Sequence, residues 1–236
     1  MSGLHVLPVE GLPEVTRAAD LAGMICDAVQ LQHRDVVVVT QKVVSKAEGA
    51  MADVDPSDPL SHKPLVERES VRILRRRGDL IISETRHGFV CANAGIDLSN
   101  VERGQAALLP EDPDRSARRI RDGIRWRHDL DVAVIVSDTF GRPWRRGVTD
   151  VAIGSAGIRA VLDLRGTEDA YGRELQVTEV AIVDEIAGAA DLVMGKATGV
   201  PVAVVRGLDP AAFGEGAARS GVVSDVVRSP AEDLFR

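Results

Sequence analysis

One segment of the sequence gathers several side chains that could handle phosphate groups. Asp138 follows the apolar run 132–136, and Thr139 comes next with a hydroxyl oxygen. Because ligands collect beyond the carboxyl ends of buried strands, a carboxylate there is well placed to hold a hard metal ion. Arg142 and Arg145 follow closely, and arginines beside such a carboxylate favour phosphate binding and charge neutralisation. For Asp138 alone, an aspartate that only caps a turn is the alternative.

A second carboxylate lies in a segment of small and polar residues. Asp97 is followed by Ser99 and Asn100, whose hydroxyl and amide groups offer further oxygen atoms. Two carboxylates from separate loops suit Mg²⁺ or Mn²⁺, because these ions take few protein oxygens and keep places for phosphates and water. A local turn, in which the Asp97 side chain bonds to nearby backbone, is an equally good interpretation.

Two lysines follow the apolar run 36–39. Lys42 and Lys46 are four residues apart, so on a helix they would share one face as solvated charges. In a loop at the end of a strand they would instead bind polyphosphate as point charges. The spacing alone leaves both interpretations open.

The elements that must position these residues follow from hydrophobic periodicity. Continuous β-branched runs are typical of strands buried on both faces, whereas apolar residues at helical spacing indicate helices. The two kinds of element alternate too irregularly for a doubly wound fold, so we expect a mixed α/β or α+β chain with two lobes. We expect strands at 4–9, 36–40, 80–82, 89–91, 132–136, 159–164 and 201–205, helices at 16–29, 64–77, 113–127 and 178–190, and a strand end or loop at 40–49.

Composition excludes several classes of protein. The 236 residues carry a formal net charge of -7, which argues against nucleic acid or an anionic membrane as the main partner. Aromatic residues make up only 3%, too few for a platform that stacks nucleic-acid bases. No apolar stretch approaches the length of a membrane span, and two cysteines cannot form a disulfide framework. We therefore expect a cytoplasmic protein.

Several familiar catalytic motifs are absent from the sequence. It contains no P-loop, no glycine-rich dinucleotide fingerprint, no nucleophile elbow and no zinc-protease motif. Any nucleotide must therefore be held by a different arrangement.

Four motifs together resemble the coenzyme F420-0:L-glutamate ligase family, also called coenzyme F420 gamma-glutamyl ligases. The resemblance runs in order from about residue 6 to about residue 207, and four separate motifs are far more specific than one. The motifs are Gly11-Leu12-Pro13-Glu14, the segment 40–49, the segment 86–97 from Arg86-His87-Gly88 to Asp97, and the segment 137–145 from Ser137-Asp138-Thr139 to Arg145.

The resemblance implies an activity, its cofactors and its partners. Members of the family ligate L-glutamate to coenzyme F420-0 with GTP and then add gamma-linked glutamates, so GTP, coenzyme F420-0 and L-glutamate are the expected ligands. Two divalent ions, Mg²⁺ or Mn²⁺, are implied, with K⁺ as a further candidate. The implied fold is two-lobed, of unusual topology, and forms an intertwined homodimer. A non-catalytic nucleotide-binding or assembly module that serves a flavin domain is the alternative function.

The resemblance also implies roles for individual residues. Lys46 and Arg142 or Arg145 would stabilise developing charge, and His87 is a candidate base by its chemistry, although a structural or substrate-positioning histidine fits equally well. The metal ligands would be Asp97, Asp138 and Thr139. The nucleotide contacts would be Gly11, Leu12, Pro13, Glu14, Thr40, Gln41, Lys42, Lys46, Asn100, Met194, Gly195, Lys196 and Gly199.

The sequence departs from the family pattern at two points. Archaeal members tend to carry an oxygen ligand for a second metal in the segment where this chain has Lys196, and a charged lysine cannot bind a metal. The chain also resembles the N-terminal domain of a two-domain actinobacterial form. We expect residues 1–236 to be one ligase domain without the nitroreductase-like domain that follows in that form.

Overall fold

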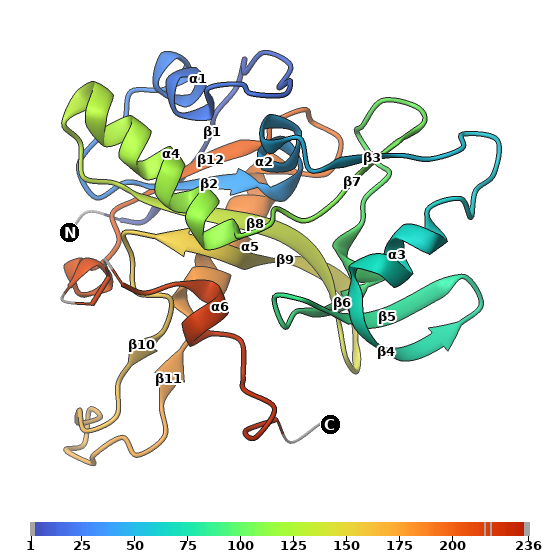
Figure 1. The fold of residues 1–236 in the computed structure, drawn as a ribbon. Helices are drawn as coiled ribbons and strands as arrows, with labels where there is room; N and C mark the ends of the chain where they lie inside the picture. Colours follow the sequence, from blue (N-terminus) through green and yellow to red (C-terminus); the bar gives the residue numbers. More distant parts are fainter. Residues whose placement is uncertain (1–2, 215, 218, 234–236) are drawn as a thin grey trace.

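A five-stranded mixed sheet forms the centre of the computed structural model, which describes residues 3–214, 216–217 and 219–233 (Figure 1). Helices and several sheets combine in one chain, which confirms the expected mixed α/β class. The order of the central strands is β1 (His5–Pro8), β12 (Val202–Arg206), β2 (Val36–Thr40), β8 (Ala133–Arg142) and β9 (Arg145–Ala156).

Strands β2 and β8 are the parallel pair at the heart of this sheet. Val36 lies opposite Ala133 and Thr40 opposite Ser137, so the two strands run in register and end at the same edge. All four valines at 36–39 are inaccessible to solvent, as the continuous β-branched run predicts. The common edge therefore brings the segments after residues 40 and 137 together.

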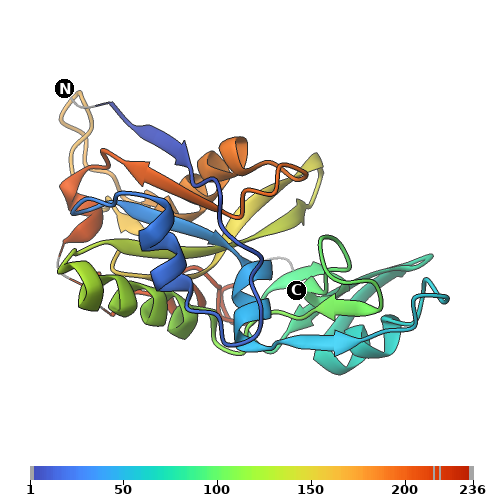
Figure 2. The same ribbon diagram turned by 90° about the horizontal axis from the view of Figure 1, so that it is seen from above.

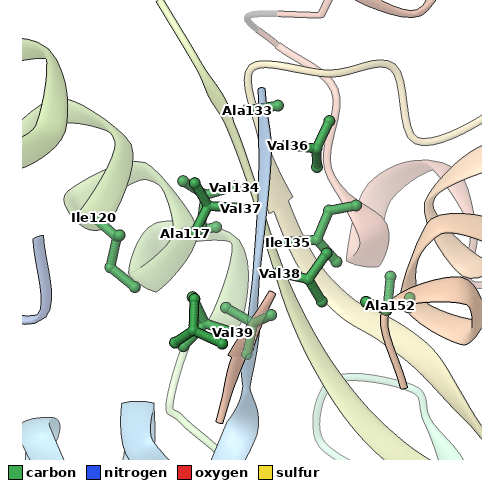
Figure 3. Packing of buried hydrophobic residues seen from close by; sticks show 14 of the residues in the cluster. Val36, Val37, Val38, Val39, Ala117, Ile120, Ala133, Val134, Ile135 and Ala152 are labelled. Atoms are coloured by element: carbon green, nitrogen blue, oxygen red, sulfur yellow. The ribbon is translucent and has the colours of Figure 1, made fainter. Parts of the chain in front are cut away.

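Two long helices cover opposite faces of the central sheet (Figures 1 and 3). Helix α4 (Pro113–His128) packs on β8 and β9, where Ala117 and Ile120 face the valines of β2. Helix α5 (Ile182–Met194) packs on the other face against β9, β12 and β1. Helix α1 (Leu21–Ala28) rests on α4. With both faces covered, the sheet is buried and its carboxyl edge is the natural place for a site.

A second, smaller lobe lies beside the central sheet (Figure 2). It has its own apolar core, formed by Val66, Ile81, Ala94, Ile96 and Ala106, which is separate from the main core. Two lobes are therefore present, as the sequence predicts. The elements of this lobe are α3 (Lys63–Glu69), β4 (Ser70–Arg77), β5 (Leu80–Thr85), β6 (Val90–Ala92), the 3₁₀ turn η1 (Asn93–Gly95), and the paired strands β3 (Met51–Asp53) and β7 (Gln105–Ala107).

The remaining elements are short. They are β10 (Leu162–Asp163), β11 (Glu179–Val180), the 3₁₀ turn η2 (Pro210–Phe213) and α6 (Val222–Asp225). Within the described chain, no helix is long and apolar enough to cross a membrane.

The expected helix at 64–77 is wrong in its second half. Helix α3 ends at Glu69, and β4 then pairs with β5 through a tight turn at Gly78-Asp79. Gly78 has φ +57, a conformation that glycine adopts without strain. The run of three arginines at 75–77 favours a helix by propensity, but cross-strand pairing decides the structure, so these arginines lie on an exposed strand.

The segment 40–49, expected as a strand end or loop, is helix α2 (Gln41–Glu48). It starts directly after β2 and ends at Gly49, whose φ of +73 provides the left-handed cap. Helix α1 is capped by Asp20 rather than Thr16, because the Asp20 carboxylate accepts from the backbone of Gly23.

Two further expectations about strands are corrected by the structure. The strand expected at 159–164 is reduced to Leu162–Asp163. Strand β9 was not predicted at all, although it forms the longest ladder in the described sheets with β8. Beyond Val136, strand β8 also continues to Arg142, so Asp138 and Thr139 stand on a strand rather than in a loop.

Candidate functional site

A cavity of about 810 Å³ opens at the carboxyl edge of β2 and β8. Its walls come from the start of α2, the loop at 97–102, strands β8 and β9, and the end of α5 with the loop that follows. Cavities of this size accommodate ligands as large as a nucleotide. Because the loop at 97–102 follows the η1 turn of the small lobe, both lobes contribute to the cavity.

Most of the residues predicted from the sequence meet in this cavity, although they come from five separate segments. Gly11, Leu12, Pro13, His87, Arg142 and Arg145 do not line it. Those that do are Glu14, Thr40, Gln41, Lys42, Lys46, Asp97, Asn100, Asp138, Thr139, Met194, Gly195, Lys196 and Gly199.

The two lysines of α2 face the cavity together. The Lys42 ammonium lies 2.8 Å from the Asp97 carboxylate and 2.9 Å from the Ser99 hydroxyl. The Lys46 ammonium lies 2.5 Å from the Glu14 carboxylate. Both lysine side chains are only 17% exposed. Lys42 and Lys46 do share one face of a helix, as one of the two interpretations predicts. Their charges, however, line a cavity instead of extending into solvent.

Asp97 forms the local turn that one interpretation predicts, whereas its role as a metal ligand stays a prediction. One carboxylate oxygen accepts from the Ser99 N–H at 2.7 Å, the local turn, and the other is paired with Lys42. Burial by itself raises the pKa of Asp97, but Lys42 and the hydrogen bond from Ser99 outweigh it, so the net pKa is lowered. Asp97 therefore carries its negative charge at neutral pH.

Asp138 is packed closely by protein but still borders the cavity. Burial above all, together with the nearby charges of Asp97 and Asp150, raises its pKa to about 7 against the opposing 2.8 Å hydrogen bond from the Thr139 N–H. Lys42 is the one positive charge among these influences and the weakest of them, so the Asp138 carboxylate has little compensating positive charge. A divalent ion near Asp138 and Asp97 would supply it, with the remaining coordination positions filled by ligand oxygens and water.

The described side chains alone do not provide a complete set of metal ligands. Among residues 3–233, less 215 and 218, no group of three or more His, Cys, Asp or Glu side chains is placed to hold a metal ion. Asp97 and Asp138 offer carboxylate oxygens, the ligand type that Mg²⁺ prefers in proteins.

An ionic cluster opposite α2 was missed by the sequence analysis. The Lys196 ammonium lies 2.6 Å from Asp150, 2.5 Å from Asp191 and 2.8 Å from the Thr139 hydroxyl. Asp150, 3% exposed, also accepts from Thr139 at 2.6 Å and from Ser137 at 3.1 Å. The apolar residues at 151–153 could have revealed strand β9, which sets Asp150 directly opposite Thr139.

His87 lies outside the cavity. Its ring stacks on Phe89 with centroids 5.5 Å apart, and Nε2 lies 3.0 Å from the carbonyl oxygens of Pro110 and Glu111. Burial lowers the pKa of His87, so the ring is neutral at physiological pH. These contacts tie the strand region of the small lobe to the start of α4.

The two predicted arginines also lie outside the cavity. Arg142 and Arg145 are exposed where β8 turns into β9, and Arg142 donates to the carbonyl of Arg146 at 3.4 Å. Their role in charge stabilisation stays a prediction.

Comparison with known proteins matches the chain to a single family over most of its length. The model of the F420-0:Gamma-glutamyl ligase family matches residues 11–207. Coenzyme F420:L-glutamate ligase of Methanopyrus kandleri is 44% identical, with all of both chains covered. The proteins of the same name from Methanothermobacter thermautotrophicus and Archaeoglobus fulgidus are 42% and 41% identical over 99% of this chain, covering 99% and 96% of their own lengths. With its cavity built from the matching motifs, this chain belongs to the F420-0:gamma-glutamyl ligase family.

Proposed function

We propose that the chain is a GTP-dependent ligase that joins L-glutamate to coenzyme F420-0 by an amide bond and then adds gamma-linked glutamates. Membership in the family supports ligation of glutamate in coenzyme F420 biosynthesis. The observation that carries the nucleotide part is the cavity at the carboxyl edge of β2 and β8, with its lysines and carboxylates.

The distribution of lysine supports a polyphosphate ligand. The chain has four lysines, and three of them, Lys42, Lys46 and Lys196, line this one cavity. No arginine of the described chain lines it, although arginine is far more abundant in the sequence. Ammonium groups on flexible stems bind phosphate oxygens as point charges, and the first turn of α2 adds the positive end of a helix dipole. The phosphates of GTP are therefore expected beside α2.

A divalent ion is proposed to bind at Asp97 and Asp138. When bound, it would neutralise the phosphate oxygens and polarise the transferred phosphoryl group. Asp138 provides a carboxylate with little compensating positive charge around it, and Asp97 can leave Lys42 because its side chain is partly exposed. Lys42 is then released toward the nucleotide, so the two groups exchange partners when GTP enters.

The proposed reaction proceeds through an acyl phosphate. A carboxylate oxygen of coenzyme F420-0 attacks the γ-phosphorus of GTP, the bond to the bridging oxygen breaks, and GDP leaves. The α-amine of glutamate, as free base, then attacks the acyl carbon, and phosphate leaves while the amine loses a proton. In this scheme Lys42 and Lys46 hold the phosphates in line and stabilise the charge that develops on them.

The test is GDP formation with each substrate omitted in turn, combined with mass detection of the glutamylated product. We expect GDP only when coenzyme F420-0 and glutamate are both present, in a one-to-one ratio with new amide bonds. GTP binding without any product would instead support the non-catalytic nucleotide-binding module. Product formed equally well without GTP would contradict the proposal.

We also propose that the chain forms a homodimer. Strands β4, β5 and β6 present several large apolar side chains to solvent, which a partner chain could cover. These side chains are Val71, Ile73, Leu74, Leu80 and Val90. Light scattering at micromolar concentration should give twice 25.2 kDa, and a V71E/L74E variant should shift toward the single mass. A wild-type monomer with full activity would contradict the dimer.

A further inference from the structure

The Lys196 ammonium has the coordination of a bound cation. Its three oxygen neighbours belong to Asp150, Asp191 and Thr139, at 2.5 to 2.8 Å. A lysine ammonium has three N–H donors, so each donor has one acceptor and none is left over. The group therefore fills its oxygen pocket completely.

The oxygens that hold Lys196 are themselves fixed. Asp150 is buried on β9, and hydroxyl groups of Ser137 and Thr139 donate to its two oxygens. Asp191 lies on the last turns of α5, one helical turn before the loop that carries Lys196. The pocket is thus built by the sheet and a helix, and the flexible lysine stem reaches into it from the loop.

We infer that Lys196 is a resident cation of the site, occupying the oxygen pocket of Asp150, Asp191 and Thr139 in place of a second divalent ion. The donor set would suit a hard metal if the lysine were absent, because two carboxylates and a hydroxyl remain. A charged ammonium and a divalent ion cannot share these three oxygens. The inference concerns the site of the proposed function, and it predicts one divalent ion per chain, at Asp97 and Asp138.

The first test counts bound Mn²⁺ by the loss of the free-ion signal in electron paramagnetic resonance. Wild-type protein is compared with Lys196→Gln, and with Lys63→Gln as a matched control outside the cavity. We expect Lys196→Gln to bind one more Mn²⁺ per chain than the wild type, and Lys63→Gln to bind the same number. Equal numbers in Lys196→Gln and the wild type would overturn the inference, as would two ions at this site in the wild type.

A second test needs no variant, so it holds even if Lys196→Gln fails to fold. An amine-acylating reagent is applied to the wild-type protein with and without Mn²⁺, and modification of each lysine is read by mass spectrometry. We expect Lys196 to react more slowly than Lys63 and to stay equally protected when Mn²⁺ is added. Release of Lys196 by Mn²⁺, seen as several-fold faster acylation, would show that the metal displaces it. Neither test requires turnover, so a failure here is distinguishable from a failure of the ligase activity.

Discussion

The two ends of the cavity place their charges in opposite ways. At the α2 end the lysines are the sheltered partners, because Lys46 is 17% exposed whereas the Glu14 carboxylate paired with it is 77% exposed. At the α5 end the carboxylate is sheltered, because Asp150 is 3% exposed and its partner Lys196 is 51% exposed. The α2 end of the cavity therefore holds positive charge in place, whereas the α5 end holds negative charge in place.

This difference indicates which partner each end can release. An exposed carboxylate such as Glu14 loses little when it leaves, since ion pairs at a surface are weak. A phosphate can then replace it beside a lysine that is already in position. The buried Asp150 has no such freedom, because an unpaired buried charge is costly, so it retains a cation. The α2 end is suited to bind an anionic ligand, and the α5 end is suited to keep its cation.

The largest loss of activity is expected from substitution of Asp138, which lies between the two ends of the cavity. Asp138→Asn keeps the shape of the side chain but removes the charge that a metal ion needs, so several kcal/mol of transition-state stabilisation should be lost. We expect activity to fall by at least about 1,000-fold while circular dichroism and thermal unfolding stay close to the wild type. Asp122→Asn, on the exposed face of α4, serves as the control. Activity within a few-fold of the wild type would remove Asp138 from the site.

The next largest effect is expected on GTP binding at the α2 end of the cavity. A charge-assisted contact is worth about 1.5–3 kcal/mol, so Lys46→Ala should weaken GTP binding by about 10- to 150-fold. Calorimetric titration of GTP in the presence of Mg²⁺ measures the change, with Lys63→Ala as the matched lysine outside the cavity. An unchanged dissociation constant for Lys46→Ala would show that this lysine is only structural, and Lys42 would become the next candidate.

A smaller effect is expected on stability at the α5 end. In Asp150→Asn one carboxylate oxygen becomes an NH2 group, so the remaining amide oxygen can keep only one of the two hydrogen bonds from Ser137 and Thr139, and the charge-assisted bond to Lys196 is weakened. Because Lys196 is half exposed, solvent screening limits the loss in unfolding free energy to about 1–2 kcal/mol. Urea unfolding of the metal-free protein measures it. A loss as large as that of a fully buried ion pair would show that Lys196 is less accessible to water than the structure indicates.

The smallest expected effect is a gain in GTP affinity instead of a loss. Glu14→Gln removes the anion that competes for Lys46, and an exposed ion pair is worth about 0.2–1 kcal/mol. We therefore expect GTP to bind up to about five-fold more tightly. Weaker binding in Glu14→Gln would mean that Glu14 contacts the nucleotide directly instead of competing with it.

The main sheet could be predicted from the sequence because its signals are local. The valines at 36–39 and the apolar residues at 132–136 are strands that any buried sheet would require, and they fix the edge where Asp138 lies. Strand β4 and helix α2 could not be assigned correctly, because cross-strand pairing with β5 decides one and the two lysines fit either a helix or a loop. Long-range pairing overrides local preference in such cases.

The residues of the site show the same difference between local signals and long-range pairing. Asp97, Asp138 and Lys46 were identified from motifs, and the fold brings them into one cavity. Asp150 and Asp191 were missed, because a carboxylate in a strand or on a helix carries no signal until its neighbours across the sheet are known. The partners of Lys196 could be recognised only once β8 and β9 were paired.

The central claim, that the nucleotide binds in the cavity beside α2, is tested most directly by lysine footprinting. The wild-type protein is treated with an amine-acylating reagent with and without GTP and Mg²⁺, and the modification of each of its four lysines is quantified by mass spectrometry. The account predicts that GTP slows modification of Lys42 and Lys46 several-fold and leaves Lys63 unchanged. Equal modification of Lys42 and Lys46 with and without saturating GTP would contradict it.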